Sequence, residues 1–216
     1  MKSILIIGMG KFGQILAAKM QELGNHIMIV DKDEEIVNEL AHEYTNAVIG
    51  NCTNESVLKS LGINNFDICF VTIGNDFQSS LEITSLLKEM GAKYVIAKAE
   101  RDIQAKFLLR NGADEIVYPE RDSAIKLAIR CNANNIFDYI ELTQDYSIFE
   151  IPVLPQWVNE TLSSVDVRKK FKITIIAVKN NNVLFPIPSA DYVFKPDDHV
   201  VVIGKHSDVF KLTSKI

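Results

Sequence analysis

Short runs of Val, Ile and Leu alternate with longer segments of helical periodicity through the first half of the chain. Apolar runs of this kind are typical of parallel strands that are covered on both faces. The strands expected from them are residues 3–7, 26–30, 47–49, 67–73, 94–98 and 115–118. Because strands alternate with helices, we predict an α/β fold with a Rossmann-type doubly wound parallel sheet over residues 1–118.

Capping signals mark the helices between these strands. Asp33 and Thr53 belong to the residue types that cap helix N-termini, and each precedes a helical segment. Glycine can adopt the left-handed conformation that often ends a helix. The helix ends expected on this basis are Gly24, Gly62, Gly91 and Gly112.

The pattern changes after residue 118. A helix is expected over 120–132, followed by a polar segment, 134–140, with little regular structure of its own. Alternating strands follow at 147–153, 173–178, 183–187 and 199–203, with short helices near 159–165 and 208–213. We therefore predict a crossover helix and linker over 119–145 and a small α+β C-terminal subdomain over 146–216.

Composition narrows the possible functions. The chain has 216 residues and a net charge of −5, which argues against a nucleic-acid-binding protein. Its three cysteines and four histidines show no metal-ligand spacing, and scattered thiols suit a reducing cytoplasm. No apolar run approaches the ~18 residues that cross a bilayer, so any role at a membrane is expected to depend on a partner.

The glycine-rich segment Gly8-Met9-Gly10-Lys11-Phe12-Gly13 follows the first predicted strand and opens a helix. Glycines at these positions allow a tight turn, close approach of the backbone to a pyrophosphate, and close packing of helix on strand. Asp31 ends the second strand, near the separation of about 20 residues at which an acid binds a ribose hydroxyl. The segment therefore predicts a nucleotide site, and the Asp31 charge disfavours NADP.

Other strand ends should lie at the same edge of the sheet. Lys11 could contact a phosphate or remain a solvated lysine, and Asn51 could bind an edge of adenine through its side-chain amide. Thr53 fits a helix cap nearly as well as a ligand contact. The complete set expected to bind the nucleotide is Gly8, Met9, Gly10, Lys11, Phe12, Gly13, Asp31, Lys32, Asn51, Cys52, Thr53, Gly74, Asn75 and Lys98.

Catalysis is not expected. A nicotinamide enzyme needs a proton donor or acceptor beside the ring, and no Ser/Tyr/Lys spacing, His–Asp pair or metal cluster stands out. We therefore expect a binding protein rather than an enzyme, with no catalytic residues.

The order of the motifs resembles the regulator of potassium conductance (RCK) domain, and most closely the KtrA/TrkA-like cytosolic subunits of Ktr and Trk potassium uptake systems. The resemblance covers essentially the whole chain. It is carried by the glycine-rich segment and by Val30-Asp31, Gly50-Asn51-Cys52-Thr53, Asn65-Phe66-Asp67, Lys98, Asn111-Gly112-Ala113-Asp114 and Tyr118-Pro119-Glu120-Arg121-Asp122.

The resemblance implies a regulatory subunit whose N-terminal domain binds ATP, ADP or NAD(H). It implies homodimers that assemble into a ring, expected to have eight subunits, which gates a membrane potassium channel or transporter subunit from the cytoplasmic side. Residues Gly8, Gly10, Lys11, Phe12 and Gly13 would hold phosphates and Asp31 the ribose. Asn51 and Cys52 would lie beside the adenine, with Gly74, Asn75 and Lys98 lining the rest of the site.

Three further implications concern single residues. Ktr-type subunits commonly have arginine where this chain has Lys11, and lysine lacks the two-pronged guanidinium, so weaker discrimination of ATP from ADP follows. Glu120 resembles a position that holds a divalent cation, with an ordinary acidic helix start as the alternative. Arg168 and Pro186 occupy places similar to those that bind cyclic di-AMP in some relatives, although Arg168 also fits an ordinary surface arginine.

Two other functions stay open at this point: an NAD(H)-binding redox regulator of a different partner, and a small NAD-dependent oxidoreductase. The helix over 120–132 carries more apolar residues than one stripe against a sheet requires. Together with Ile136, Phe137, Tyr139 and Ile140, this predicts an exposed apolar surface that a second copy of the chain covers in a two-fold dimer.

Overall fold

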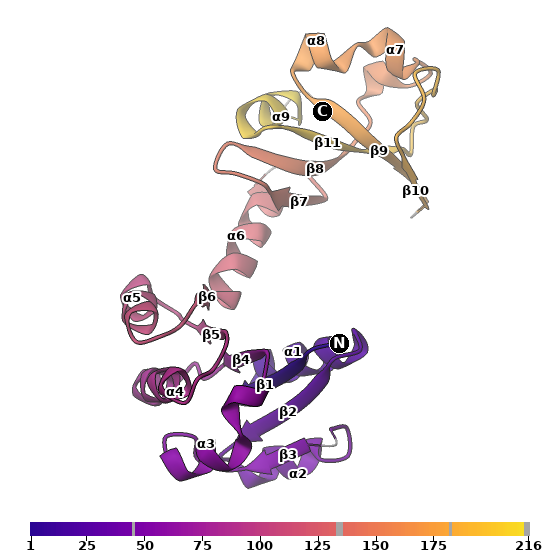
Figure 1. The fold of residues 1–216 in the computed structure, drawn as a ribbon. Helices are drawn as coiled ribbons and strands as arrows, with labels where there is room; N and C mark the ends of the chain where they lie inside the picture. The colour runs from indigo at the N-terminus through magenta and orange to yellow at the C-terminus, as the bar shows by residue number, and fades with distance from the viewer. Residues whose placement is uncertain (45, 133–135, 182, 214–216) are drawn as a thin grey trace. The chain divides into compact units, whose positions relative to one another are not determined.

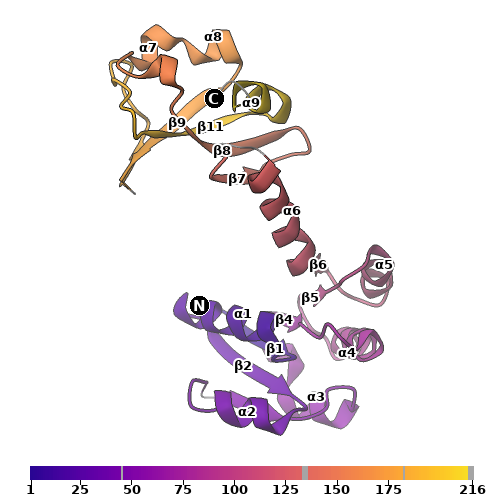
Figure 2. The ribbon, with the colours of Figure 1, turned by 180° about the vertical axis from the view of Figure 1, so that it is seen from behind.

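A computed structural model describes residues 1–44, 46–132, 136–181 and 183–213 and divides the chain into two compact units, Met1–Asp122 and Ser123–Ile216. Figures 1 and 2 show the two units from opposite sides. Within the described residues, no helix is both long and apolar enough to span a membrane.

The first unit is a parallel six-stranded sheet with strand order β3-β2-β1-β4-β5-β6, which confirms the predicted Rossmann-type fold (Figure 1). Its strands are β1 (Ser3–Ile7), β2 (His26–Asp31), β3 (Asn46–Ile49), β4 (Ile68–Val71), β5 (Val95–Lys98) and β6 (Glu115–Val117). The connecting helices are α1 (Lys11–Glu22), α2 (Glu34–Leu40), α3 (Glu55–Leu61), α4 (Phe77–Glu89) and α5 (Asp102–Arg110).

The central strands of this sheet, β1 and β4, are buried on both faces, which explains their continuous apolar runs. Along β1, Leu5 and Ile7 pack into one core, whereas Ile4 and Ile6 pack into another. Because successive side chains of a strand point to opposite faces, each residue of β1 from Ile4 onward has an apolar layer to enter.

The capping predictions are correct except at one position. The Asp33 side chain caps α2 by accepting hydrogen bonds from the backbone N–H groups of Glu35 and Ile36. Thr53 is not a cap; Asn54 caps α3 instead. The four glycines predicted at helix ends all have positive φ angles: Gly24, Gly62, Gly91 and Gly112.

The second unit contains an antiparallel five-stranded sheet with strand order β10-β9-β11-β8-β7. The strands are β7 (Asp138–Glu141), β8 (Tyr146–Pro152), β9 (Thr174–Asn180), β10 (Val183–Pro186) and β11 (His199–Lys205). The helix α6 (Pro119–Asn132) leads into this unit, whose short helices are α7 (Leu162–Val165), α8 (Val167–Phe171) and α9 (His206–Thr213). Phe149, Trp157 and Phe194 are fully buried in its core.

Two sequence predictions about this unit are wrong. The segment expected to lack regular structure contributes β7, which pairs with β8. Ile136 and Tyr139 are buried in the core of their own unit rather than on an exposed surface. The predicted apolar surface is therefore smaller, with Phe137 and Ile140 still exposed.

Candidate functional site

The glycine-rich segment makes a tight turn between β1 and α1. Gly8 has a φ angle of +98°, a conformation that side chains other than glycine rarely adopt. A Cβ on Gly13 would overlap the Gly8 carbonyl oxygen and lie 2.9 Å from Thr72 Oγ1. At Gly10, by contrast, no heavy atom of the described residues lies within 4 Å of a Cβ position. The first and third glycines are thus needed by the fold, whereas Gly10 leaves open space.

The start of α1 can accept an anion. Gly10 is its N-cap residue, and in the described chain no side chain caps this helix. The first N–H groups of a helix lack partners within it, and its dipole favours negative charge there. A phosphate is the type of ligand that such a helix start binds.

Asp31 holds the turn in place. Its Oδ2 atom accepts a hydrogen bond of 2.5 Å from the Met9 N–H, and Oδ1 accepts one of 2.9 Å from the Asp33 N–H. The carboxylate therefore joins the end of β2 to the glycine turn. Each carboxylate oxygen has a second lone pair with which it could accept a hydroxyl.

Thr72, which the sequence did not single out, fixes the same turn from the opposite strand. Its hydroxyl lies 2.5 Å from the Gly8 carbonyl oxygen and 3.1 Å from that of Ile7, to which it can donate. Thr72 directly follows β4, so the turn is held between the ends of β2 and β4.

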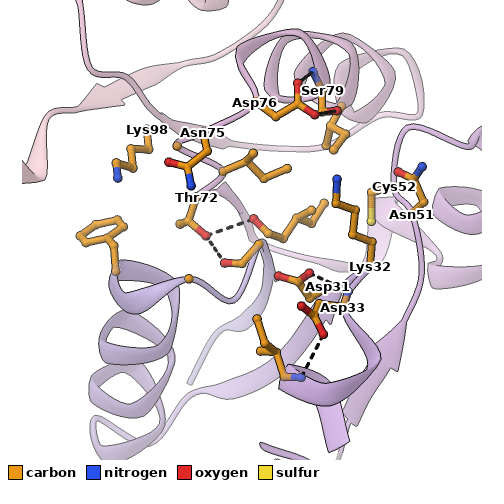
Figure 3. A pocket seen from close by; sticks show the side chains of 18 of the residues that line it. Asp31, Lys32, Asp33, Asn51, Cys52, Thr72, Asn75, Asp76, Ser79 and Lys98 are labelled. Atoms are coloured by element: carbon orange, nitrogen blue, oxygen red, sulfur yellow. Dashed lines mark hydrogen bonds between the residues drawn. The ribbon is translucent and has the colours of Figure 1, made fainter.

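A cavity of about 410 Å³ opens at this edge of the sheet, within the size range of small-molecule sites (Figure 3). Of the predicted residues, it is lined by Gly8, Gly10, Lys11, Phe12, Asp31, Lys32, Asn51, Cys52, Gly74, Asn75 and Lys98, together with Glu120. Lining residues that the sequence did not single out as ligand contacts are Ile7, Asp33, Ile36, Gly50, Thr72, Ile73, Asp76, Ser79 and Ile83.

Three predicted residues do not line the cavity. Met9 is buried and contributes its backbone N–H to Asp31. Gly13 packs on the Gly8 carbonyl group, and Thr53 donates its hydroxyl to Asn51 Oδ1 at 2.9 Å. Their contribution is to shape the turns that carry the lining residues.

Cys52 lies against the site as a neutral thiol. Its side chain is buried, and burial followed by the nearby Asp31 charge raises its pKa to about 12. Asn51 beside it uses its side-chain oxygen within the loop, because that oxygen also accepts the Thr53 N–H at 3.1 Å. Figure 3 shows the two side chains on the same side of the pocket as Asp31 and Lys32.

The charged residues of the cavity differ in how they are paired. Lys98 Nζ lies 2.6 Å from Glu120 Oε1, and the hydrogen bond from this ammonium lowers the pKa of Glu120. Asp76 caps α4 and accepts the Ser79 hydroxyl at 2.6 Å, which lowers its pKa. Lys11 and Lys32 make no ion pair with any described residue.

The described residues contain no group of three or more His, Cys, Asp or Glu side chains that could hold a metal ion. Glu120 supplies a single carboxylate, which already faces an ammonium. The divalent cation expected from the resemblance therefore stays a prediction.

The second unit contains a smaller cavity of about 310 Å³ that includes Arg168. Its other lining residues include Asp166, Ile175 and Pro188. Pro186 is on β10 and does not line this cavity. The structure therefore does not bring the two residues predicted for cyclic di-AMP into one pocket.

Comparison with known proteins follows the same division of the chain. The TrkA-N domain family matches residues 4–119, and the TrkA-C domain family matches residues 146–216. Ktr system potassium uptake protein C of Bacillus subtilis is 39% identical over 215 residues, which cover 100% of this chain and 97% of that protein. This chain belongs to the Ktr/Trk family of potassium uptake proteins.

Other members of the Ktr/Trk family match over nearly their full length. Ktr system potassium uptake protein A of Bacillus subtilis is 34% identical, covering 96% of this chain and 94% of its own. Among solved structures, the GsuK channel superposes with a TM-score of 0.72 at 20% identity, covering 98% of this chain but 38% of the channel chain. The family resemblance predicted from the sequence is confirmed, and the structural match supports the fold.

Proposed function

We propose that this chain is the nucleotide-sensing regulatory subunit of a potassium uptake system and acts at the cytoplasmic face of the membrane. The observation that carries the proposal is the cavity at the sheet edge, where the glycine turn, the uncapped start of α1 and the Asp31 carboxylate meet. The names of its relatives supply the transport system, because they are potassium uptake proteins.

The cavity fits an adenine nucleotide, either ATP or ADP or NAD(H). Phosphates lie against the turn at Gly10 and the start of α1, with the Lys11 ammonium as counter-charge. The ribose hydroxyls donate to Asp31, and the base lies beside Asn51 and the neutral Cys52 thiol. Structures of GsuK in complex with NAD and with ADP carry similar folds, which is consistent with either ligand class.

The role is one of binding rather than catalysis. Asp33 and Asp76 cap helices, Lys98 pairs with Glu120, and Asp31 accepts backbone N–H groups. Lys11 and Lys32 are cations without an ion-pair partner among the described residues, and we assign no proton donor or nucleophile in the cavity. A redox-sensing regulator remains the second candidate, since NAD(H) fits the same cavity; the chain would then respond to the ratio of NADH to NAD rather than to ATP and ADP.

The proposed potassium uptake system contains two kinds of partner for this chain, further copies of the chain itself and a membrane subunit. Four exposed apolar side chains suit a homodimer contact: Ile125 and Leu127 on α6, Phe137 just before β7, and Ile140 on β7. Dimers of this kind would assemble into a ring, expected to contain eight chains, on the cytoplasmic face of a potassium channel or transporter subunit.

Ligand-induced thermal shifts distinguish the candidates. A ligand at 100 times its dissociation constant stabilises the folded state by about 2.7 kcal/mol, so titration with ATP, ADP, NADH and cyclic di-AMP ranks the four directly. Stabilisation by ATP or ADP alone supports the uptake subunit, and stabilisation by NADH alone supports the redox regulator. No stabilisation by any nucleotide would refute the proposed site.

Potassium uptake tests the transport assignment. The chain is co-expressed with a Ktr-type membrane subunit in cells that lack their own potassium uptake, and growth at low potassium is measured. Uptake that rises with the parent chain but not with the Asp31→Ala variant supports a regulatory subunit. Uptake that does not depend on the chain would contradict it.

A further inference from the structure

Cationic side chains are concentrated at one place on the second unit. Four of the five residues from 168 to 172 are basic and exposed, and we call them the basic cluster: Arg168, Lys169, Lys170 and Lys172. Three of them lie on α8, which Figures 1 and 2 both show at the outer border of the second unit. The cluster is therefore open to the surroundings along the whole of this short helix.

The packing of α8 fixes the side on which these cations lie. Val167 is buried and Phe171 is partly buried, one helical turn later, and both contact the core of the unit. The Phe171 ring lies beside that of Trp157, with 5.6 Å between the centroids. Because Val167 and Phe171 take the side of the helix that faces the core, the three cations between them project away from it.

The backbone at the end of α8 also indicates a use for the cations. Lys172 follows the helix with a φ angle of +57°, in the left-handed region that lysine seldom adopts. Four glycines take this conformation at helix ends in the first unit, where it costs less. A lysine at a position that favours glycine suggests that its charge serves a purpose.

Ion pairs neutralise the basic cluster only in part. Among the described residues the cluster makes one ion pair, from Lys169 Nζ to Asp166 Oδ2 at 3.6 Å, and 87% of the Lys169 side chain is exposed. Lys170 lines a cavity of about 420 Å³ together with Glu160, whose Oε2 atom already accepts the Ser164 hydroxyl at 2.7 Å. A positive surface therefore remains around α8.

The charge of the whole chain is divided in the same sense. Residues 123–216 contain 11 lysines and arginines and 10 aspartates and glutamates, a formal net charge of +1. Residues 1–122 contain 12 and 18, a formal net charge of −6. Charge asymmetry between two parts of a chain suggests a charged partner for one of them. The partner that suits the basic cluster is an anionic one.

We propose that the basic cluster is a docking surface for the anionic lipid headgroups of the membrane. The cytoplasmic leaflet has a negative surface potential, and clusters of about four or more lysines and arginines are typical of segments that bind it. Three members of the cluster are lysines, whose point charges suit a diffuse layer of headgroups better than one phosphate bound in a directed way. This inference rests on the proposed location at the membrane and not on the nucleotide cavity.

Co-sedimentation of the full chain with vesicles tests the proposal. One set of vesicles is phosphatidylcholine, and the other contains about one-third phosphatidylglycerol. We expect the parent to bind the anionic vesicles only, and less tightly as salt is added. The triple variant Lys169→Gln, Lys170→Gln, Lys172→Gln should bind them at least about thirtyfold more weakly, because each lysine near an anionic surface contributes to the attraction.

A matched variant controls for the change in net charge. Lys19→Gln, Lys59→Gln, Lys93→Gln removes three exposed lysines of the first unit, each of which pairs with a carboxylate. It should bind anionic vesicles as the parent does. Trp157 is the single tryptophan of the chain, so its emission reports whether the packing around α8 is preserved in the first triple variant.

A single substitution repeats the test with less risk to the fold. Lys169→Glu changes a side chain that is 87% exposed and leaves the packing of α8 intact. It should also weaken binding to anionic vesicles, and unchanged binding in both this variant and the first triple variant would refute the proposal.

The remaining outcomes separate lipid from other partners and this inference from the proposed function. Equal losses in the two triple variants would show that net charge alone matters, and equal binding of the parent to a DNA duplex would show a surface for any polyanion; either result overturns the proposal. A parent that is stabilised by ADP but binds no vesicles would refute the lipid surface alone. A parent that binds anionic vesicles but no nucleotide would refute the nucleotide site alone.

Discussion

Two lysines at the cavity of the first unit and a charged cluster of the second unit differ in how their charges are paired. In the first unit, Lys11 and Lys32 line the cavity and pair with no described residue. In the second unit, Glu150 is bound by both Lys179, at 3.0 Å, and His199, at 2.9 Å. The His199 ring in turn stacks on Phe137 with 4.1 Å between the ring centroids. Charged side chains without an ion-pair partner are available to a ligand, whereas charged side chains that pair with one another stabilise the fold of their own unit.

The backbone shows the same contrast. The first unit uses glycine at Gly8 and Gly10 to bring main-chain groups to the cavity. The second unit binds a fully buried carboxylate, Asp198, through the side chains of Asn180 and Tyr192 and the N–H group of Lys195. The glycine turn of the first unit thus surrounds an open cavity, whereas the hydrogen bonds to Asp198 in the second unit are made within the protein itself.

Among the variants considered, Gly13→Ala should have the largest effect on stability and nucleotide binding. Its Cβ would overlap the Gly8 carbonyl oxygen, so the turn must shift. We expect a loss of about 2–3 kcal/mol in the free energy of unfolding and loss of nucleotide binding. Denaturant unfolding and ADP titration measure both.

Gly10→Ala is the matched control for this variant. Its φ angle of −64° suits alanine, and open space surrounds the position. Stability should stay within about 0.5 kcal/mol of the parent, whereas ADP affinity should fall because the methyl group occupies the approach to the backbone. Equal stability losses in the two variants would show that the turn does not depend on close packing at Gly13.

Asp31→Ala should have the next largest effect. The side chain predicted to bind ribose also accepts two backbone N–H groups, so its removal should cost about 1–3 kcal/mol even without ligand. Nucleotide stabilisation should disappear as well. Thermal unfolding without ADP measures the loss of intrinsic stability, and unfolding with ADP measures the loss of nucleotide stabilisation. An unchanged melting temperature without ligand would contradict the role of Asp31 in holding the turn.

Glu150→Gln tests the paired cluster of the second unit. Burial would raise the pKa of Glu150, but the hydrogen bonds from His199 and Lys179 outweigh it and hold the pKa below its usual value of 4.5. A lowered folded pKa gives stability that is present above pH 4.5 and lost as the pH falls through the folded value. The variant should therefore lose less stability than the parent on acidification below pH 4.5. An identical acid dependence in urea unfolding would contradict this.

The smallest expected effect is a difference between the two units in how fast their cysteines react with a thiol reagent. Burial raises the pKa values of Cys52 and Cys69 in the first unit to about 12, so only about one thiol in 10⁴ is ionised at pH 8. Cys131, in the second unit, is exposed. A thiol reagent should label one cysteine rapidly, and Cys131→Ser should abolish that rapid phase. Rapid labelling that persisted in the variant would show that the first unit opens.

Sequence periodicity was sufficient for the parallel sheet because each of its strands is a nearly pure apolar run. It was insufficient for β7, where Tyr139 and Ile140 are flanked by Asp138 and Glu141 in a strand of four residues. A strand this short is specified by its partner, β8, rather than by its own pattern.

The same distinction applies to the cavity. Gly8, Asp31 and Lys98 could be predicted because motif spacing and strand ends locate them. Thr72 could not, because its role depends on the Gly8 carbonyl group, 64 residues away along the chain. Thr53 was assigned as a cap because threonine is a suitable residue type, but Asn54 takes that position one residue later.

The strand order also affects how the protein emerges from the ribosome. β1 is synthesised first but lies between β2 and β4, so it cannot be enclosed until residues up to Val71 have followed. The wall of the cavity is complete once Glu120 has been made, before any strand of the second sheet exists. Domains commonly fold as units during synthesis, so cellular nucleotide could stabilise the nascent first unit while translation of the remainder continues.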